Sequence, residues 1–591
     1  MATDDSDLRR HVRYQPDEKP PTVIAMGLGL QLAILSISGI VLTPAIVIRA
    51  ASGTESYISW AVFAAVAISG LTTILQAVRV GRVGAGYVLL MGTSGAFIAV
   101  CVTALVEGGP AMLATLVAIS SLFQFSLAGR LSLFRRILTP TVAGTAVMLI
   151  PVTVMPIIFD MLKVPSEVAP APAAPLSALA TLLVSVVIAL KATGSLRLWA
   201  PVIGVAVGSA VAGLFGLYDI GLITEASWIG LPAGEWPGFD LDFGPAFWAL
   251  LPAFVFVTLI GAIETIGDSV AIQRVSWRRP RAVDFRSVQG AVAADGVGNL
   301  LSGLAGTVPN TTYSSSIAVT ELTGVAARSV GIVIGLVFIA LAFLPKALAV
   351  VLAIPGPVVA AYATVLMAML FMVGLKIVVQ DGSDYRKGLI SGVAFWIGVG
   401  FQNGVIFPDY FSGLVGGLLQ NGMTAGGLAA IFMTLFVELT EPRRSRTKVE
   451  FALSALPKIR EFLGEFSSRC SWDEEMASRL DAVGEETLLT LLEKHEARAE
   501  HDHRQLLLTA HKEDGGAVLE FIASTSEDNL QDRIALLGEQ TAGVLVEREV
   551  SLRLLRHFAS SVLHQQYHGL DIVTVRVDAP ERLQRTMDRS R

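Results

Sequence analysis

Two carboxylates, Glu264 and Asp268, interrupt the otherwise apolar stretch FVFVTLIGAIETIGDSVAIQ. Their spacing of four residues puts both side chains on one face of a helix, one turn apart. A carboxylate at membrane depth is costly and by default marks the pathway of a substrate or an ion. Burial and a neighbouring like charge both favour the protonated carboxyl, so one of the pair is able to carry a proton. We interpret one carboxylate as a ligand for substrate N–H groups and the other as an orienting or cation-carrying group; the alternative is a structural role at a broken helix.

Two short segments, GYVLLMGTSGAFIAV and GTVPNTTYSSSIAVT, carry Gly, Pro, Ser and Thr where a membrane-spanning helix would carry Leu. Non-helical backbone at membrane depth is tolerated only where it is buried in protein or lines a watery cavity. We expect each segment to form a short extended piece and a half-helix, whose exposed N–H groups suit an anionic or acceptor-rich ligand. The residues expected to line this site are Thr93, Ser94 and Gly95 in the first segment and Tyr313, Ser314, Ser315 and Ser316 in the second. The alternative is that these small residues only let helices pack closely.

The composition places these elements in a membrane. Hydrophobic residues make up 53% of the 591 residues and charged residues 16%, and the mean hydropathy is +0.62, unlike a soluble domain. The formal net charge of -6 suggests no nucleic-acid partner. Only two cysteines are present, which argues against a disulfide framework or a cysteine metal site. We expect no metal and no cofactor.

Fourteen apolar stretches predict the membrane part. They are residues 23–48, 57–78, 87–104, 110–128, 137–160, 174–191, 198–217, 247–273, 285–304, 307–320, 328–353, 357–379, 386–404 and 409–438. Most approach the roughly 20 residues that cross a hydrocarbon core of about 30 Å. The two short segments are the third and the tenth, at matching positions in two sets of seven, which indicates a 7+7 inverted repeat with a substrate site at the midplane.

The predicted loops are alternately rich and poor in Lys and Arg. The rich loops lie on the side of the membrane that holds the N-terminus. Because positive charges collect in cytoplasmic loops, we expect both termini in the cytoplasm of a cell whose inner membrane holds the chain. The predicted organisation is an N-terminal tail over 1–22 and a transmembrane domain over 23–440. Asp295, Asn299, Gln402, Asn403 and Asn421 are further polar residues at depth, and we expect them to be mainly structural.

The stretches AIETIGDSVA and DGVGNLLSGLAGTVPNTTYSSSIAVTELTGVAAR resemble the nucleobase-ascorbate transporters, also called nucleobase:cation symporters of the second type or the xanthine/uracil permease group. The resemblance covers about residues 20–440. It implies a core and a gate domain in the 7+7 repeat, a homodimer, and a nucleobase held between spans three, eight and ten. It also implies that Glu264 binds substrate and that Asp268 couples to the proton or shapes the site. The chain departs from the family at Ser315 and Ser316, where Glu or Gln followed by Asn is usual.

From about residue 450 the composition becomes that of a soluble protein, which predicts a cytoplasmic α/β domain over 450–591. Its pattern predicts helices at 456–470 and 473–495, a strand hairpin at 503–524, a helix at 549–569 and a strand at 571–577. This order resembles the ATP-binding fold of anti-sigma-factor and histidine kinases. Thr490 replaces that fold's metal-binding Asn and no D-x-G-x-G follows the hairpin, so we expect a degenerate domain used for dimerisation or regulation.

The combined prediction is a secondary active transporter, not an enzyme, for a nucleobase-like solute such as xanthine, urate or uracil. Protons or sodium ions would drive it by alternating access. Two alternatives stay open: an anion transporter of the related sulfate/bicarbonate group, and a membrane sensor derived from a transporter. The paired acids argue against a small inorganic anion, because desolvated carboxylates repel it.

Overall fold

The computed structural model describes residues 12–578, apart from 135–138, 165–169, 233, 235, 280, 380–381, 383–384, 408–409, 411–418, 420, 441–443, 493–504, 514, 524–528 and 537–549. The ends of the predicted tail and C-terminal domain, 1–11 and 579–591, lie outside that part. The chain forms two compact units, one of Met1–Arg278 and Ser287–Val437 and the other of Arg279–Arg286 and Glu438–Arg591.

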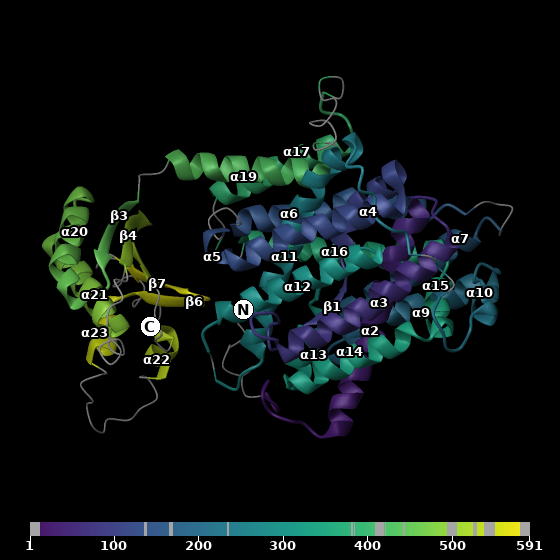
Figure 1. Ribbon diagram of the computed structural model, residues 1–591, viewed down its shortest axis with the longest axis horizontal. Coiled ribbons are helices and arrows are strands. Elements are labelled where there is room, and N and C mark those ends of the chain that lie inside the picture. Colours follow the sequence, from purple (N-terminus) through teal and green to yellow (C-terminus); the bar gives the residue numbers. More distant parts are fainter. Residues whose placement is uncertain are drawn as a thin grey trace. The chain divides into compact units, whose positions relative to one another are not determined.

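The described part of the first unit is built from helices, as Figure 1 shows, with two very short strands between them. Its helices are α2 (Thr22–Ala50), α3 (Glu55–Val78), η2 (Gly95–Phe97), α4 (Ile98–Gly129), α5 (Leu131–Phe134), α6 (Pro140–Asp160), α7 (Ala173–Lys191), α8 (Ser195–Leu198), α9 (Ala200–Leu214), α10 (Ile220–Glu225), α11 (Pro245–Val275), α12 (Phe285–Ala305), α13 (Ser315–Thr323), α14 (Arg328–Ala342), α15 (Pro345–Leu352), α16 (Gly356–Val379), α17 (Tyr385–Gln402) and α19 (Gly422–Thr440).

Eight of the described helices are long and apolar enough to cross a membrane, and a ninth is added if α14 and α15, bent by 88° at their break, count as one span. The protein is therefore a multi-pass membrane protein. Each of the fourteen predicted stretches contains one of the helices or part of one. The counts differ partly because α4 joins two predicted stretches across a kink, where Gly109 has a φ of 74° and precedes Pro110. The fourteen-span count itself stays a prediction.

The two interrupted segments form extended pieces followed by helices, as the sequence predicts. The extended pieces are β1 (Leu90–Thr93) and β2 (Asn310–Tyr313), and they pair antiparallel with Leu90 opposite Tyr313 and Thr93 opposite Asn310. Their pairing supplies backbone hydrogen bonds that neither segment makes within itself, which a non-helical backbone at membrane depth requires. The half-helices that follow are η2, which runs into α4, and α13.

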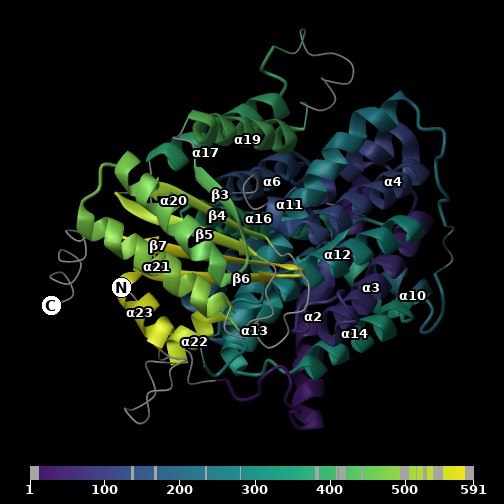
Figure 2. The ribbon, with the colours of Figure 1, turned by 60° about the vertical axis from the view of Figure 1, so that its left-hand side comes forward.

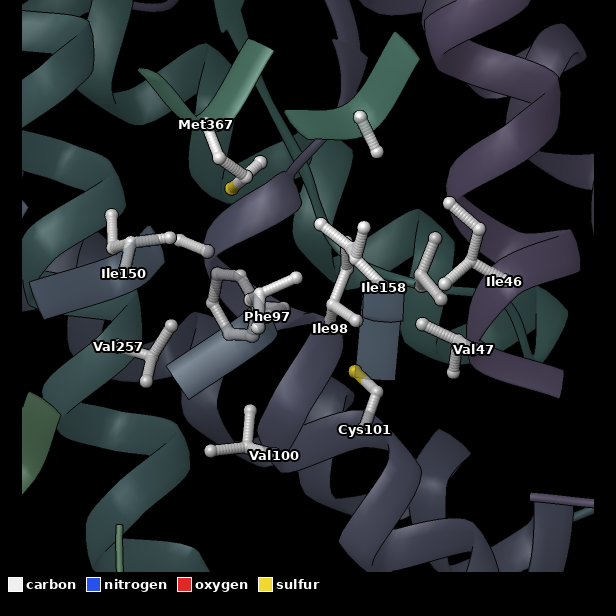
Figure 3. Packing of buried hydrophobic residues seen from close by; sticks show 14 of the residues in the cluster. Ile46, Val47, Phe97, Ile98, Val100, Cys101, Ile150, Ile158, Val257 and Met367 are labelled. Atoms are coloured by element: carbon white, nitrogen blue, oxygen red, sulfur yellow. The ribbon is translucent and has the colours of Figure 1, made fainter. Parts of the chain in front are cut away.

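Apolar packing fixes the start of α4 beside β1. Figure 3 shows Phe97 and Ile98 among Ile150 of α6, Val257 of α11 and Met367 of α16. A second cluster joins α2, α3 and α14, which lie side by side (Figure 1). The broken segment is thus held by cores on both sides, although its own backbone is irregular.

The second unit contains a five-stranded antiparallel sheet in the order β3-β4-β5-β7-β6. The strands are β3 (Ser445–Glu450), β4 (Gln505–Glu513), β5 (Gly516–Ala523), β6 (Ser561–Tyr567) and β7 (Leu570–Val577). Helices α20 (Leu456–Arg469), α21 (Glu474–Leu492) and α23 (Val550–Phe558) pack on one face, as Figure 2 shows for α20 and α21. This unit also contains two further short helices, η3 (Leu453–Ala455) and α22 (Leu530–Leu536).

The predicted helix over 549–569 is wrong in its second half. Only Val550–Phe558 is helical, and Ser561–Tyr567 forms β6, which pairs with β7. The cause is the turn after Tyr567: Tyr567 pairs with Leu570, and Gly569 between them has a φ of 80°. A two-residue hairpin turn with glycine at positive φ sets the register of the two strands that it joins, so the residues directly before the turn are extended and pair with β7. Strand β3 was not expected, because the sequence pattern predicted no element over residues 445–450.

Candidate functional site

The carboxylate of Asp268 is held by the second broken segment. Its Oδ2 accepts a hydrogen bond of 2.8 Å from the Thr312 hydroxyl, and its Oδ1 accepts one of 2.7 Å from the Ser314 hydroxyl. Thr312 lies in β2, and Ser314 directly precedes α13. Asp268 therefore joins α11 to the junction between β2 and α13, and both of its oxygens are engaged.

Glu264, one turn earlier on α11, is in the opposite situation. Its Oε1 atom is buried and has no hydrogen-bond partner among the residues that the structure describes. Because buried polar atoms are almost always hydrogen-bonded, each exception needs an explanation. A carboxylate oxygen without a partner is a ready acceptor for an N–H group of a ligand.

Donors come from the starts of the two half-helices. Ser94 precedes η2 and Ser314 precedes α13, and neither side chain makes a hydrogen bond that caps its helix. The Ser94 hydroxyl is buried and has no hydrogen-bond partner in the described part of the chain. The first N–H groups of a helix are free of intrahelical partners and carry partial positive charge, so they suit carbonyl or anionic oxygens.

Tyr313 locks β2 against β1 and α2. Its hydroxyl donates a hydrogen bond of 2.9 Å to the Thr93 carbonyl, and the Thr93 hydroxyl donates one of 3.1 Å to the Gly39 carbonyl. The ring fits between Gly39 and Gly92: a Cβ atom added at Gly92 would lie 2.5 Å from the ring carbon that bears the hydroxyl. The structure thus brings Tyr313 and Thr93 into contact, through the backbone carbonyl of Thr93.

Replacing Gly92 with Ala should therefore displace the Tyr313 ring and break its bond to Thr93. We expect ligand affinity to fall about tenfold or more, since overpacking a close contact costs about 1–3 kcal/mol. Binding to purified protein, compared with Gly129→Ala, provides the measurement, because a Cβ at Gly129 would meet nothing within 4 Å. Equal affinities in the two variants would contradict this tight fit.

The neighbouring serines have separate contacts. Ser315 Oγ lies 3.3 Å from Ser36 Oγ of α2, so Ser315 is placed between α13 and the first long helix. Ser316 is fully buried; its hydroxyl donates to the Tyr313 carbonyl at 3.1 Å and accepts from the Leu90 N–H at 3.3 Å. Ser316 therefore supports the junction of β2 and α13. A Cβ added at Gly95 would lie 3.5 Å from Met367 of α16, which covers that side of the site.

Sequence reasoning missed Ser36, Ser38 and Tyr362. The Ser38 hydroxyl on α2 lies 3.4 Å from the Tyr362 hydroxyl on α16, so two distant helices meet beside Tyr313. A signal existed, because Ser36 and Ser38 interrupt an apolar stretch and Tyr362 is the one tyrosine in the stretch 357–379. Serine alone, however, is common in tightly packed membrane helices and marks no site.

Behind the carboxylate pair lies a buried polar network centred on Asp295. Its Oδ2 accepts hydrogen bonds from Gln124 at 2.6 Å and from the Thr265 hydroxyl at 2.8 Å. Asn299 donates to Gln124 at 2.7 Å and accepts from the Asn310 N–H at 2.6 Å. The network ties α4, α11 and α12 to β2. These contacts agree with a structural role, as do those of Gln402 to the Gly422 N–H and of Asn421 to the Thr424 N–H.

Within the described residues, the site therefore offers a carboxylate oxygen that has no hydrogen-bond partner, two helix starts and hydroxyl groups. This arrangement suits reversible binding of a small molecule with both N–H donors and oxygen acceptors. Among the described residues, no group of three or more His, Cys, Asp or Glu is arranged to hold a metal ion.

A polar binding site between broken helices in a multi-pass membrane protein is characteristic of a transporter. The family model Xan_ur_permease, described as a permease family, matches residues 24–406. The chain belongs to this permease family, whose members transport solutes and are not enzymes. The resemblance drawn from the motifs around Glu264 and Tyr313 is confirmed.

Two individual relatives of the chain are also named as permeases. A putative purine permease of Clostridium perfringens is 30% identical over 440 residues, covering 72% of this chain and 91% of that protein. The xanthine permease XanP of Escherichia coli (strain K12) is 29% identical over 448 residues, covering 71% and 94%. Among solved structures, the murine anion transporter Slc26a9 in its inward-facing state matches with a TM-score of 0.46 and 13% identity, covering 73% of this chain and 71% of that one.

Proposed function

We propose that the protein is a symporter that carries a nucleobase or a purine-like solute, such as xanthine, urate or uracil, by alternating access. The proposal rests on the family and on the names of two relatives, a putative purine permease and a xanthine permease. A nucleobase presents ring N–H donors and carbonyl acceptors along its edges. The site presents the complementary groups.

The observation that carries the proposal is that the buried Oε1 atom of Glu264 has no hydrogen-bond partner among the described residues. In this interpretation Glu264 accepts a hydrogen bond from a ring N–H, while the first N–H groups of η2 and α13 donate to ring carbonyls. Asp268 orients β2 and α13 through its two hydroxyl contacts. We assign coupling to Asp268 and Glu264, with H⁺ or Na⁺ as the driving ion, because a carboxylate is able to bind either.

Uptake into proteoliposomes tests this function. Radiolabelled xanthine, urate and uracil would be offered under an imposed pH gradient, an imposed sodium gradient or neither, with labelled bicarbonate and sulfate as the comparison. We expect a nucleobase to accumulate only with one of the gradients. Accumulation of an inorganic anion, with no nucleobase uptake, would favour the anion-transporter alternative and overturn the proposal.

Replacing Ser315 with Gln should shift preference toward xanthine-like bases. Glutamine restores a side chain that is usual in the family and can form a paired hydrogen bond, a gain of about 1–3 kcal/mol if it replaces a weaker contact. The Ser315→Ala variant is the control, since it removes the bond to Ser36 without adding an amide. Competition by xanthine, uracil and urate gives the answer: the same rank order in the wild type and in Ser315→Gln would place residue 315 away from the ligand.

The finer architecture is part of the same proposal. We infer fourteen spans in a 7+7 inverted repeat of core and gate domains, a homodimer, an inner-membrane location and cytoplasmic termini. The domain limits are 1–22, 23–440 and 450–591, and the last domain serves dimerisation or regulation without binding nucleotide. Accessibility of single cysteines to a membrane-impermeant reagent, placed at each terminus, tests the orientation directly.

A further inference from the structure

A segment at the start of the chain, which we call the N-terminal strap (residues 12–20), is hydrogen-bonded to the segment that follows α13. The N–H groups of Arg13 and Tyr14 donate to the Gly324 carbonyl at 2.7 and 3.1 Å, and the Ala326 N–H donates to the Tyr14 carbonyl at 2.8 Å. Farther along, the Arg328 N–H donates to the Pro16 carbonyl at 3.1 Å. The strap therefore follows the chain from the end of α13 to the start of α14.

The same strap holds the end of α11 through Arg278, three residues beyond Val275. The guanidinium donates to both carboxylate oxygens of Glu18, at 2.7 and 2.6 Å. It also donates to the carbonyls of Val12 at 3.1 Å and Arg13 at 2.6 Å. A single exposed ion pair contributes little, but a two-bond arginine–carboxylate pair with further carbonyl contacts fixes geometry. Four hydrogen bonds thus attach the end of α11 to the strap.

Glu18 is itself held in position within the strap. Its Oε2 also accepts a hydrogen bond of 2.9 Å from the Gln15 N–H. The hydrogen bond from Arg278 keeps the pKa of Glu18 below its usual range, so the carboxylate stays ionised at neutral pH. The ion pair is accordingly present above that lowered pKa and is lost as the pH falls through it. A second ion pair, Asp17 with Arg328 at 3.0 Å, anchors the strap to α14.

The two helices joined by the strap are the ones that carry the site. Asp268 lies seven residues before the end of α11, and Ser315 begins α13, so the strap-side ends are about 10–12 Å along each helix from the site. At the site, α11 and the start of α13 are joined by the contacts of Asp268 with Thr312 and Ser314. The pair of helices is therefore connected at both ends, in addition to their direct packing, in which Ile317 of α13 joins the same apolar cluster as Ile272 of α11. Loss of the strap contacts removes the connection at one of the two ends.

We propose that Glu18 and Arg278 are positioning residues: through the N-terminal strap they fix the spacing of α11 and α13, and so the distance between Glu264 and the start of α13. Neither residue touches the ligand. The proposal rests on the proposed function for its effect on transport, but its structural part does not depend on any substrate.

A distance measurement tests the structural part. In a full-length Cys101→Ala/Cys470→Ser background, nitroxide labels at Arg274→Cys and Leu322→Cys report the separation of α11 and α13, because both side chains are exposed. We expect one narrow distribution in that background and in Glu18→Asp, which keeps the charge, and a broadened one in Glu18→Gln. Asp160→Asn, which breaks the exposed Asp160–Lys163 pair elsewhere, should leave it narrow. An unchanged distribution in Glu18→Gln overturns the proposal.

Transport kinetics test the consequence. In Glu18→Gln we expect the KM for the transported nucleobase to rise about tenfold, since small displacements of binding groups weaken binding strongly, while the maximal rate per folded protein is kept. Glu18→Asp should restore most of the affinity. A general loss of stability would reduce the amount of folded protein and leave the KM unchanged, and an unchanged KM overturns the positioning role. If the parent chain transports no nucleobase, the proposed function fails, whereas a broadened distribution still supports the strap.

Discussion

Replacing Glu264 with Gln is expected to weaken nucleobase binding strongly while the protein still folds and inserts. The Oε1 atom is buried and has no partner among the described residues, so the change breaks no bond that this atom makes to the described part of the protein. The change instead weakens binding of the ligand, because its charge-assisted hydrogen bond to the carboxylate is replaced by a weaker one to a neutral amide. A bond of that kind is worth about 1.5–3 kcal/mol, so affinity should fall by about 10- to 100-fold or more.

The matched control is Glu107→Gln, an identical chemical change at an exposed position near the kink of α4. Ligand binding to purified protein and the thermal unfolding midpoint should be measured on both variants. The expected pattern is an unchanged midpoint in both variants and strongly weakened binding only in Glu264→Gln. Wild-type affinity in Glu264→Gln would end the role assigned to this carboxylate.

Replacing Asp268 with Asn is expected to separate binding from ion coupling. Asparagine keeps one oxygen for the hydroxyl of Thr312 or Ser314 and loses the charge that both hydroxyls face. Because hydroxyl groups both donate and accept, the new amide is able to keep its place between β2 and α13. The site should still bind, but the carboxylate that would carry the coupling ion is gone.

Two assays distinguish these effects. Exchange of labelled for unlabelled nucleobase across the membrane needs only binding and the movement of the site, and should persist. Accumulation against a gradient needs coupling. The ratio of internal to external nucleobase concentration should therefore fall toward one and lose its dependence on external pH or sodium. An unchanged pH profile of accumulation in Asp268→Asn would show that coupling lies elsewhere, and Asp295 would then be the next residue to replace.

The sequence predicted the interrupted segments well, because glycine, proline and hydroxyl residues in an apolar chain have few structural explanations at membrane depth. It could not predict that β1 and β2 pair with each other. Thr93 and the Tyr313 side chain that contacts it are 220 positions apart, and strands of four residues have no periodicity to detect. Pairing depends on how the helices around them pack.

The difference between the hydrogen-bond partners of the two carboxylates could not be predicted from the sequence either. A spacing of four residues puts Glu264 and Asp268 on one face, but both have the same sequence environment of small and apolar residues. What separates them is the approach of Thr312 and Ser314 from another part of the chain. The error over 549–569 is of another kind, because the turn signal at His568 and Gly569 was present in the sequence and the helical pattern before it was extended too far.

The pairing of β1 with β2 also constrains how the protein is made. When the ribosome has released β1, its partner strand β2 has not yet been synthesised. Until then, the four-residue backbone of β1 lies in the bilayer or at the translocon without its inter-strand hydrogen bonds. An unpaired backbone group in lipid costs several kcal/mol, so the first half should remain loosely assembled until the second half emerges. Biogenesis then ends with the joining of two halves, and two separately expressed fragments should be able to complement each other inside the membrane.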